Sequence, residues 1–266
     1  MTAQAAVSKG LAATVRFLSW VAPLAILAAL WEVLSQSGLV NRSILPPFSE
    51  VVQQIIAMLI GGELALQLSV SLYRALIGFV VGATIGVIIG VTMAMVPIVR
   101  KSVYPLVTLT YALPKSALIP IALLWLGVGD SSVILCVVFG AAVPLIINSF
   151  HGAESVPEVQ IWSAESMGAS RARVFFSVIL PSALPQILTG LRMSLPLSFI
   201  LVISAEMVAS FIGIGNFIFA FGNAGSYGSM FGAIIMVMAV AFAIDQLLKF
   251  ISAYLLRWTE SESSRV

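Results

Sequence analysis

A polar stretch decides how this chain is organised: EVQIWSAESMGASRARVFFSVILPSALP, residues 158–185. It is the longest segment that is polar on one face and lies outside the apolar runs. Ala164 and Gly168 stand one helical turn apart, and two small residues at that spacing let the backbone of another protein approach closely. Pro181 and Pro185 are expected to end the segment, because proline lacks the backbone donor that a helix interior needs. The stretch therefore predicts a docking element between apolar runs.

The overall composition is that of an integral membrane protein. The 266 residues are 60% hydrophobic and 9% charged, with a mean hydropathy of +1.10, whereas soluble domains carry about 25% charged residues. The net charge of +2 comes without the basic cluster that nucleic-acid binding needs. The single cysteine, Cys136, lies in an apolar run, and the single histidine, His151, has no partner at ligand spacing. No internal disulfide and no metal site are expected.

Six membrane spans are expected in a single all-α domain of residues 1–266, because a spanning helix needs roughly 20 mostly apolar residues. The spans are Phe17–Gln36, Ala75–Val99, Val103–Leu126, Ser131–Phe150, Ile187–Met207 and Met230–Leu256. Val51–Ile60 predicts a short amphipathic helix at the membrane interface. The glycine-rich segment Phe211–Tyr227 is interpreted as re-entrant or interfacial. An extramembrane loop, residues 152–185, connects the fourth and fifth spans.

Glycines recur every four residues in the second span. This repeat predicts one smooth helix face for close packing against a neighbouring helix. The glycines are Gly78, Gly82, Gly86 and Gly90.

The basic residues predict the orientation, because they concentrate in cytoplasmic loops. Residues 1–16 then form a cytoplasmic leader, and both termini and the 158–185 stretch lie in the cytoplasm. Only Arg42 and Arg74 fall on the other side of the membrane. The cytoplasmic set is Lys9, Arg16, Arg100, Lys101, Arg171, Arg173, Arg257 and Arg265.

The 158–185 stretch resembles the cytoplasmic coupling loop (EAA loop) of ABC importer membrane subunits. The consensus of that loop is Glu-Ala-Ala, three residues, Gly, nine residues, Ile, one residue and Leu-Pro. Aligned on Gly168, Ala164 matches the second Ala, whereas Trp162 and Ser163 replace Glu and the first Ala. An ordinary amphipathic loop is the alternative. The coupling residues that the resemblance implies are Trp162, Ser163, Ala164, Glu165, Ser166, Met167, Gly168, Ala169, Leu180 and Pro181.

Further segments are similar to the nitrate/sulfonate/taurine group of these permeases, in family order from about Pro46 onward. The resemblance implies a type I ABC importer permease fold in the bacterial inner membrane and a homodimer. It also implies two ATPase subunits and a periplasmic or lipid-anchored binding protein. The matching segments are SLYRALIGF (71–79), ALIPIALLWLGVGD (117–130), FHG (150–152), LPSALPQILTGLR (180–192), SAEM (204–207) and GIGN (213–216).

The chain contains no G-x-x-x-x-G-K-[ST] phosphate loop, so ATP and Mg are expected on a partner subunit and the chain is not expected to be an enzyme. The substrate class that the resemblance implies is a sulfonate, taurine or nitrate, with a pyrimidine precursor or an aromatic acid as alternatives. An ion-coupled secondary transporter is a rival, although it usually has inverted repeats and paired carboxylates. A membrane hydrolase would need a nucleophile with a base.

Four residues in or near the spans are candidates for the translocation pathway or a gate. Lys115 lies mid-span, where a charge costs about 2.5–3.5 kcal/mol. It is interpreted as a pathway cation that favours small anions, or as a partner of Glu206, or as a snorkelling side chain. Pro114 either frees backbone carbonyls to line a cavity or only kinks a helix. Glu206 either pairs with Arg74 to hold or gate the extracytoplasmic face, or is an exposed interfacial acid. Asp245 and Lys249 predict a structural i,i+4 pair.

Overall fold

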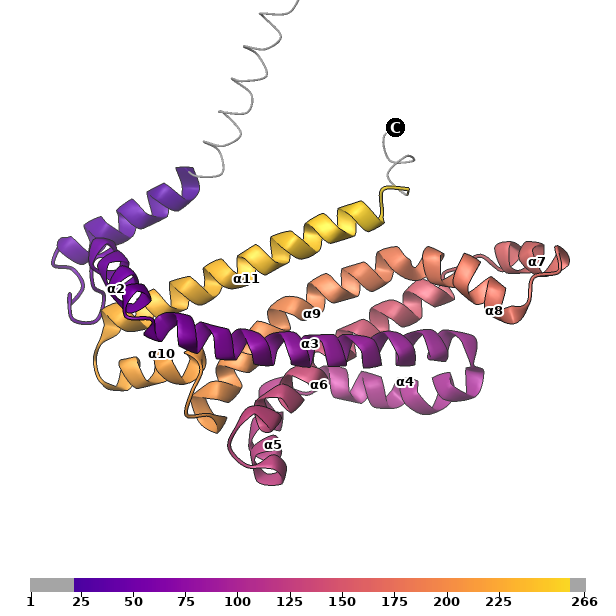
Figure 1. The fold of residues 1–266 in the computed structure, drawn as a ribbon, viewed down its shortest axis with the longest axis horizontal. Helices are drawn as coiled ribbons and strands as arrows, with labels where there is room; N and C mark the ends of the chain where they lie inside the picture. The colour runs from indigo at the N-terminus through magenta and orange to yellow at the C-terminus, as the bar shows by residue number, and fades with distance from the viewer. Residues whose placement is uncertain (1–21, 259–266) are drawn as a thin grey trace, which may run out of the picture.

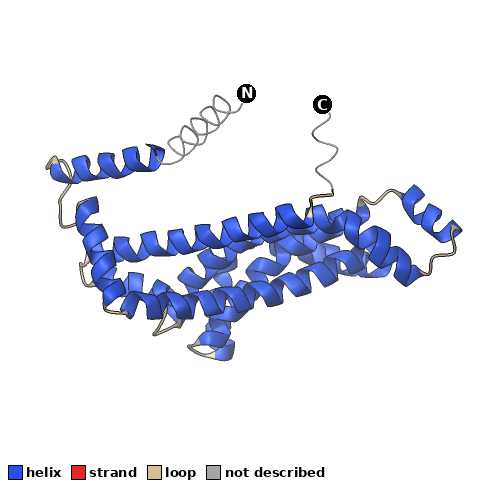
Figure 2. Ribbon diagram, turned by 45° about the horizontal axis from the view of Figure 1, so that its top comes forward, coloured by secondary structure: helices blue, strands red, loops and turns tan. Residues whose placement is uncertain are grey.

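The computed structural model describes residues 22–258. The predicted leader, residues 1–16, and the start of the first predicted span lie outside them. Within the described range the chain forms helices and no strands (Figure 2), so the all-α class is confirmed. The long helices run side by side along one axis of an elongated molecule (Figure 1).

Four helices of the described range are long and apolar enough to cross a membrane. They correspond to the second, fourth, fifth and sixth predicted spans. The described part of the first predicted span, Ala22–Gln36, is a shorter apolar helix. The four long helices are α3 (Glu63–Met95), α6 (Asp130–Glu154), the continuous helix Arg171–Ala209, and α11 (Tyr227–Leu255).

The third predicted span, Val103–Leu126, is wrong as a single helix. The chain forms α4 (Pro97–Ala112), a short 3-10 turn η1 (Lys115–Ala117) and α5 (Leu118–Leu126), with a bend of 93° at the break. Pro114 stands at this break. It lacks a backbone N–H and disfavours the helical region for the residue before it, and Leu113 is extended, with ψ 135°.

Helix α3 begins at Glu63, well before the predicted start at Ala75. Arg74 therefore lies inside a spanning helix and not in a loop beyond it. The predicted short helix over Val51–Ile60 is confirmed as α2 (Phe48–Ile60), which packs on α11, and its place at the membrane interface remains a prediction. Gly62, with φ +75°, makes the turn between α2 and α3.

The glycine repeat of α3 packs directly on α6. A Cβ on Gly78 would lie 2.5 Å from Cβ of Val137, and one on Gly82 would lie 2.6 Å from the carbonyl oxygen of Val138. Atoms cannot approach this closely, so only glycine permits the observed contact between the two helices. The predicted close packing is confirmed.

The predicted loop of residues 152–185 is shorter than expected. It contains α7 (Glu158–Ser166), and the next helix begins at Arg171 and runs through α8 (Arg171–Val174), the π turn η2 (Phe175–Ile179) and α9 (Leu180–Ala209). The expectation that Pro181 and Pro185 end the segment is wrong. Pro181 lies inside the continuous helix Arg171–Ala209, directly after the π turn, and the helix runs on past it and past Pro185.

The segment interpreted as re-entrant or interfacial forms α10 (Ile214–Asn223), which packs on α9, α11 and α3. Helices α2 and α10 lie at one end of the molecule, and α7 lies at the opposite end (Figure 1). The two ends are joined mainly by α3, α6 and α9.

Adding a methyl group to the α3–α6 contact should destabilise the fold. In Gly82→Ala the new Cβ meets the backbone of α6. We therefore expect the free energy of unfolding to fall by about 1–3 kcal/mol, measured as a lower Tm of the purified protein in detergent. Gly61→Ala is the matched control, because a Cβ there is 3.4 Å from its nearest neighbour and φ is −67°. Equal Tm values for the two variants would contradict the packing argument.

Candidate functional site

Arg74 is a buried residue of α3, and each of its three side-chain nitrogens donates at least one hydrogen bond. Its Nη1 donates to Oε1 of Glu206 at 2.8 Å and to the carbonyl oxygen of Ile212 at 2.6 Å. Its Nε and Nη2 donate to Oδ1 of Asp130 at 2.8 and 2.6 Å. Arg74 is 3% exposed and Glu206 is 0% exposed, whereas the Asp130 side chain is 58% exposed. One guanidinium thus joins α3, the first residue of α6 and the last part of α9.

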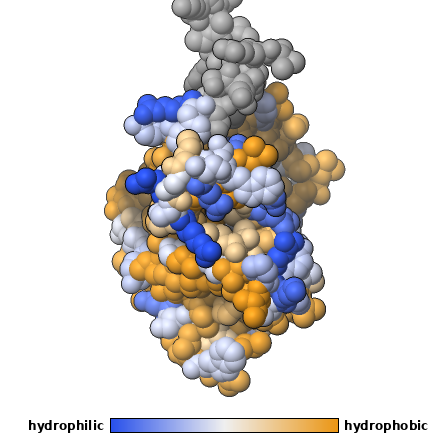
Figure 3. Space-filling model, turned by 90° about the vertical axis from the view of Figure 1, so that its right-hand side faces the viewer, coloured by the Kyte–Doolittle hydropathy of each residue, from blue (hydrophilic) through white to orange (hydrophobic). Residues whose placement is uncertain are grey.

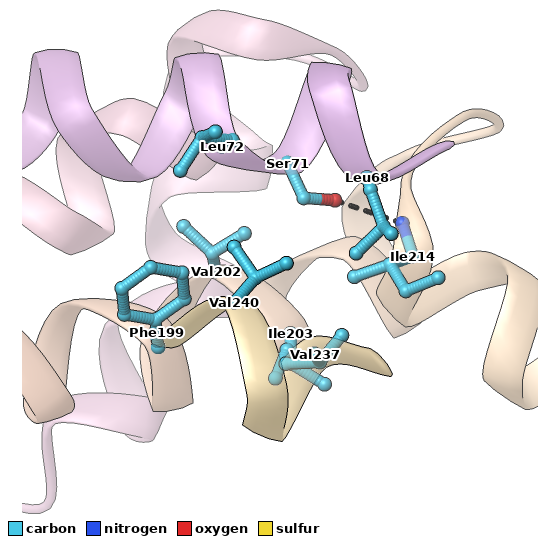
Figure 4. A pocket seen from close by; sticks show the side chains of 9 residues that line it. All are labelled: Leu68, Ser71, Leu72, Phe199, Val202, Ile203, Ile214, Val237 and Val240. Carbon is cyan, nitrogen blue, oxygen red and sulfur yellow. Dashed lines mark hydrogen bonds between the residues drawn. The ribbon is translucent and has the colours of Figure 1, made fainter. Parts of the chain in front are cut away.

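The Glu206 carboxylate also has polar partners besides Arg74. The hydroxyl of Ser71 donates to its Oε2 at 2.6 Å, and the N–H of Gly215 donates at 3.0 Å. Ser71 in turn accepts from the N–H of Ile214 at 2.8 Å, beside a small apolar pocket (Figure 4). Gly213 has φ +130°, and a Cβ there would collide with the carboxyl group. The turn before α10 is therefore shaped around this buried acid.

The cluster is suited to holding one end of the bundle together. A buried charge without a partner is strongly destabilising, so Arg74 and Glu206 require each other. The predicted pairing of these two residues is confirmed, and the alternative of an exposed acid is wrong for Glu206. A gating role for the pair remains a prediction. The sequence reasoning missed Asp130 and Ser71, although an acidic residue in the first turn of a helix was a usable signal for Asp130.

Lys115 lies away from this cluster, at the bend between α4 and α5. Its Nζ donates to the carbonyl oxygen of Tyr111 at 2.6 Å and lies 5.1 Å from the centroid of the Tyr111 ring. The alternative in which Lys115 pairs with Glu206 is wrong, since Arg74 takes that carboxylate. Lys115 instead lines an open cleft of about 850 Å³ between α4, η1, α6 and α9. Pro114 is not among the cleft residues and acts at the helix break.

Helix α7 stands at the opposite end of the molecule and exposes apolar side chains. Val159 is 69% and Trp162 58% exposed, and Met167, directly after the helix, is 79% exposed. Ala164, predicted to face a partner, points into the chain's own core and is 8% exposed. Gly168 has φ +81° and open space where a Cβ would be. This left-handed conformation ends α7, and it is the reason that the position favours glycine. Lack of space for a side chain within this chain is not the reason, because a Cβ at Gly168 would meet nothing.

The inner side of α7 packs on α8 and η2, the first part of the continuous helix Arg171–Ala209. Ala164 belongs to a cluster that includes Val91 of α3, Ala153 of α6 and Ala183 of α9. Arg100, after the turn from α3 into α4, pairs with Glu154 at the end of α6 at 2.5 Å. Figure 3 views the molecule from this end and shows hydrophilic residues gathered between hydrophobic flanks. Leu180 and Pro181, counted among the coupling residues, are half-buried in α9.

Residues 22–258 contain no group of three or more His, Cys, Asp and Glu side chains that could hold a metal ion.

The long helices, the ion pairs at both ends and the open cleft between them are features of a membrane permease. The chain belongs to the family described as "Binding-protein-dependent transport system inner membrane component", which matches residues 82–257.

Relatives and solved structures agree with this assignment. The chain is 29% identical to the taurine transport system permease protein TauC of Escherichia coli K12, over 88% of this chain and 87% of that protein. It is 36% identical to the protein named as the aliphatic sulfonates transport permease SsuC of the same strain, over 75% and 76%. A chain of the MetNI methionine ABC transporter matches with a TM-score of 0.58 and 19% identity, over 75% of this chain and 97% of that one. The type I importer permease fold is therefore confirmed.

Removing Arg74 should unfold this end of the bundle. We expect Arg74→Ala to lower the free energy of unfolding by about 3–5 kcal/mol, because the Glu206 carboxylate is left buried and without its ion-pair partner. Adding Glu206→Gln to that variant removes the stranded charge and should recover part of the loss. Thermal unfolding in detergent measures both.

Asp245 and Lys249 form an ion pair of 2.7 Å, which confirms the predicted i,i+4 contact, and both side chains are partly exposed. Asp245→Asn breaks this pair and is the control. Such pairs contribute about 0–1 kcal/mol. A Tm for Arg74→Ala as high as that of Asp245→Asn would show that the cluster does not stabilise the bundle.

Proposed function

We propose that the chain is the membrane-spanning subunit of an ATP-driven importer, in which two permease copies enclose the translocation pathway. Two ATPase subunits would bind the cytoplasmic end, and a periplasmic or lipid-anchored binding protein would deliver the solute. The observation that carries this proposal is α7, a short helix outside the spans with an exposed apolar face and an inner face packed on α8 and η2, which continue as α9.

The exposed side of α7 has the chemistry of a docking surface. Val159, Trp162 and Met167 add apolar area to a segment that also carries the exposed charges of Glu158 and Glu165. Apolar anchors with a polar surround are typical of protein interfaces. Because the inner side of α7 packs on α8 and η2, a displacement of α7 would be transmitted to the continuous helix Arg171–Ala209. Trp162 takes the place of the family's Glu, and we expect it to act as an anchor.

The orientation follows from the same assignment. The α7 end, with Arg100 and Lys101, would face the cytoplasm of a bacterial cell, and both termini would lie on that side. The end with the Arg74 cluster would face the binding protein. ATP and Mg would bind to the ATPase subunits, because this chain has no phosphate loop.

The substrate we propose is a small sulfonate of the kind named for TauC and SsuC. Nitrate, a pyrimidine precursor and an aromatic acid are the competing solutes. Uptake by the reconstituted transporter, with each solute tested as a competitor, distinguishes them.

Affinity purification of the tagged chain from its native membrane tests the importer assignment. We expect a stoichiometric ATPase with a phosphate loop to co-purify, and ATP-dependent uptake in liposomes. A permease that purifies alone and moves solute under an ion gradient without ATP would be a secondary transporter, and the proposal would fail.

Gly168→Val tests the coupling segment. Valine at φ +81° is strained by about 1–2 kcal/mol, so α7 should lose its fixed exit and ATP hydrolysis should continue without matching uptake. Gly38→Val is the matched control, because Gly38 has φ +77° and equally open surroundings at the other end of the molecule. The ratio of solute moved to ATP hydrolysed is the measurement. An unchanged ratio in Gly168→Val, or an equal fall in Gly38→Val, would contradict the role of α7.

A further inference from the structure

The cleft beside Lys115 is walled by apolar side chains on two spanning helices. Pro144 and Ile147 of α6 and Met193, Pro196 and Leu197 of α9 contribute to it. The remaining lining residues are polar: Tyr111 and Lys115 from the α4–α5 bend, and Asn148 from α6. Its volume of about 850 Å³ is in the range of small-molecule sites. The walls are therefore suited to an organic group, with polar side chains at the bend and on α6.

Lys115 brings an unbalanced positive charge to this cleft. No Asp or Glu lines the cleft, and Lys115 forms no ion pair within the part of the chain that the structure describes. An ammonium group has three donors, and the carbonyl of Tyr111 occupies one of them. The other donors remain for a ligand. A charge between spanning segments is costly unless it faces water or a ligand, and the cleft supplies that environment.

Asn148 of α6 adds a directed polar group to the lining of the cleft. Its Nδ2 donates to the carbonyl of Pro144 at 2.8 Å and contacts Sδ of Met193 at 3.8 Å. The side-chain amide is thereby held in one orientation among apolar neighbours. It offers a second polar contact in the cleft that Lys115 also lines.

We infer that this cleft is an anion subsite within the permease itself, with Lys115 binding the negative group of the solute and the α6 and α9 walls contacting a short aliphatic chain. The inference rests on the proposed transport function and makes it more specific: an alkanesulfonate fits both halves of the cleft, whereas nitrate uses only the charge. The permease would then contribute to selectivity beyond what a binding protein supplies.

Ligand binding to the full-length purified permease in detergent tests this subsite without ATP or partner proteins. The probe is sodium butane-1-sulfonate, and the readout is the rise in Tm that a ligand of the native state produces. We expect a rise of several degrees in the wild type and in Lys115→Arg, and no rise in Lys115→Gln. Each shift is taken against the same variant without ligand, so that a change in the stability of Lys115→Gln does not affect the comparison.

Two controls separate charge recognition from nonspecific effects. Lys101→Gln removes an exposed cation outside the cleft and should keep the full rise. Butylammonium, of similar size but opposite charge, and sodium nitrate, without the aliphatic chain, should raise the Tm less than the sulfonate. An equal rise in Lys115→Gln and the wild type, an equal effect of butylammonium, or no rise in the wild type would overturn the subsite.

Uptake by the complete reconstituted importer separates this inference from the proposed function. ATP-dependent uptake whose KM for the sulfonate rises about tenfold or more in Lys115→Gln, but not in Lys115→Arg, supports both. ATP-dependent uptake with the same KM in Lys115→Gln overturns the subsite and leaves the importer assignment intact. Absence of ATP-dependent uptake in the wild type overturns the importer assignment, while the binding measurement still decides the subsite.

Discussion

The buried ion pair between Arg74 and Glu206 is the constraint around which one end of this protein is built. In a spanning helix neither charge has water as an alternative partner, so each must be bonded within the protein. Meeting that requirement uses the hydroxyl of Ser71, the carboxylate of Asp130 and the backbone of the turn before α10. Four elements are consequently fixed relative to one another by one guanidinium and one carboxylate. The glycines of that turn follow from the same constraint, because the carboxyl group occupies the space of a side chain at Gly213.

The α3–α6 contact carries this fixed geometry towards the other end of the molecule. Glycines on α3 bring the helix axes so close that the backbones are in contact, and such a contact leaves little freedom for sliding. At its far end α3 contributes Val91 to the cluster that holds Ala164 of α7. A force applied to α7 passes to α8 and η2, which continue as α9, and α9 packs extensively on α6. This continuity is what a subunit needs if an event at one membrane face is to move the other.

The features that the sequence predicts correctly depend on local pattern. The predictions that are wrong concern positions whose structure depends on residues far along the chain. Four of the six apolar runs, the glycine repeat and the Asp245–Lys249 pair are recognisable from residues a few positions apart, and the structure has these. The predicted start of the second span at Ala75 is wrong, because it treats the charge of Arg74 as the boundary of the apolar run. Its partner Glu206 lies 132 residues further along the chain, and a window of local hydropathy contains no information about that bond.

Proline shows a second limit of local reasoning. Pro114 breaks a helix by 93°, whereas Pro181, Pro185 and Pro196 lie within α9. Pro181 follows the π turn η2, where the regular hydrogen bonding of the helix is already interrupted. Packing explains why interior prolines persist in a spanning helix, since neighbouring helices can satisfy the freed carbonyls. The residue type alone therefore does not determine whether the chain bends.

Arg74 and Lys115 show how one physical rule leads to two different structures. Both are cations in or between spanning segments, where an unpaired charge is costly. Arg74 meets two carboxylates and a carbonyl and is buried. Lys115 meets one carbonyl and an aromatic ring, and the rest of its surroundings is an open cleft. A fully bonded cation serves the stability of the fold, because nothing further can bind it. A cation with donors left over, kept beside an apolar cleft, is poised for a ligand that supplies the missing negative charge.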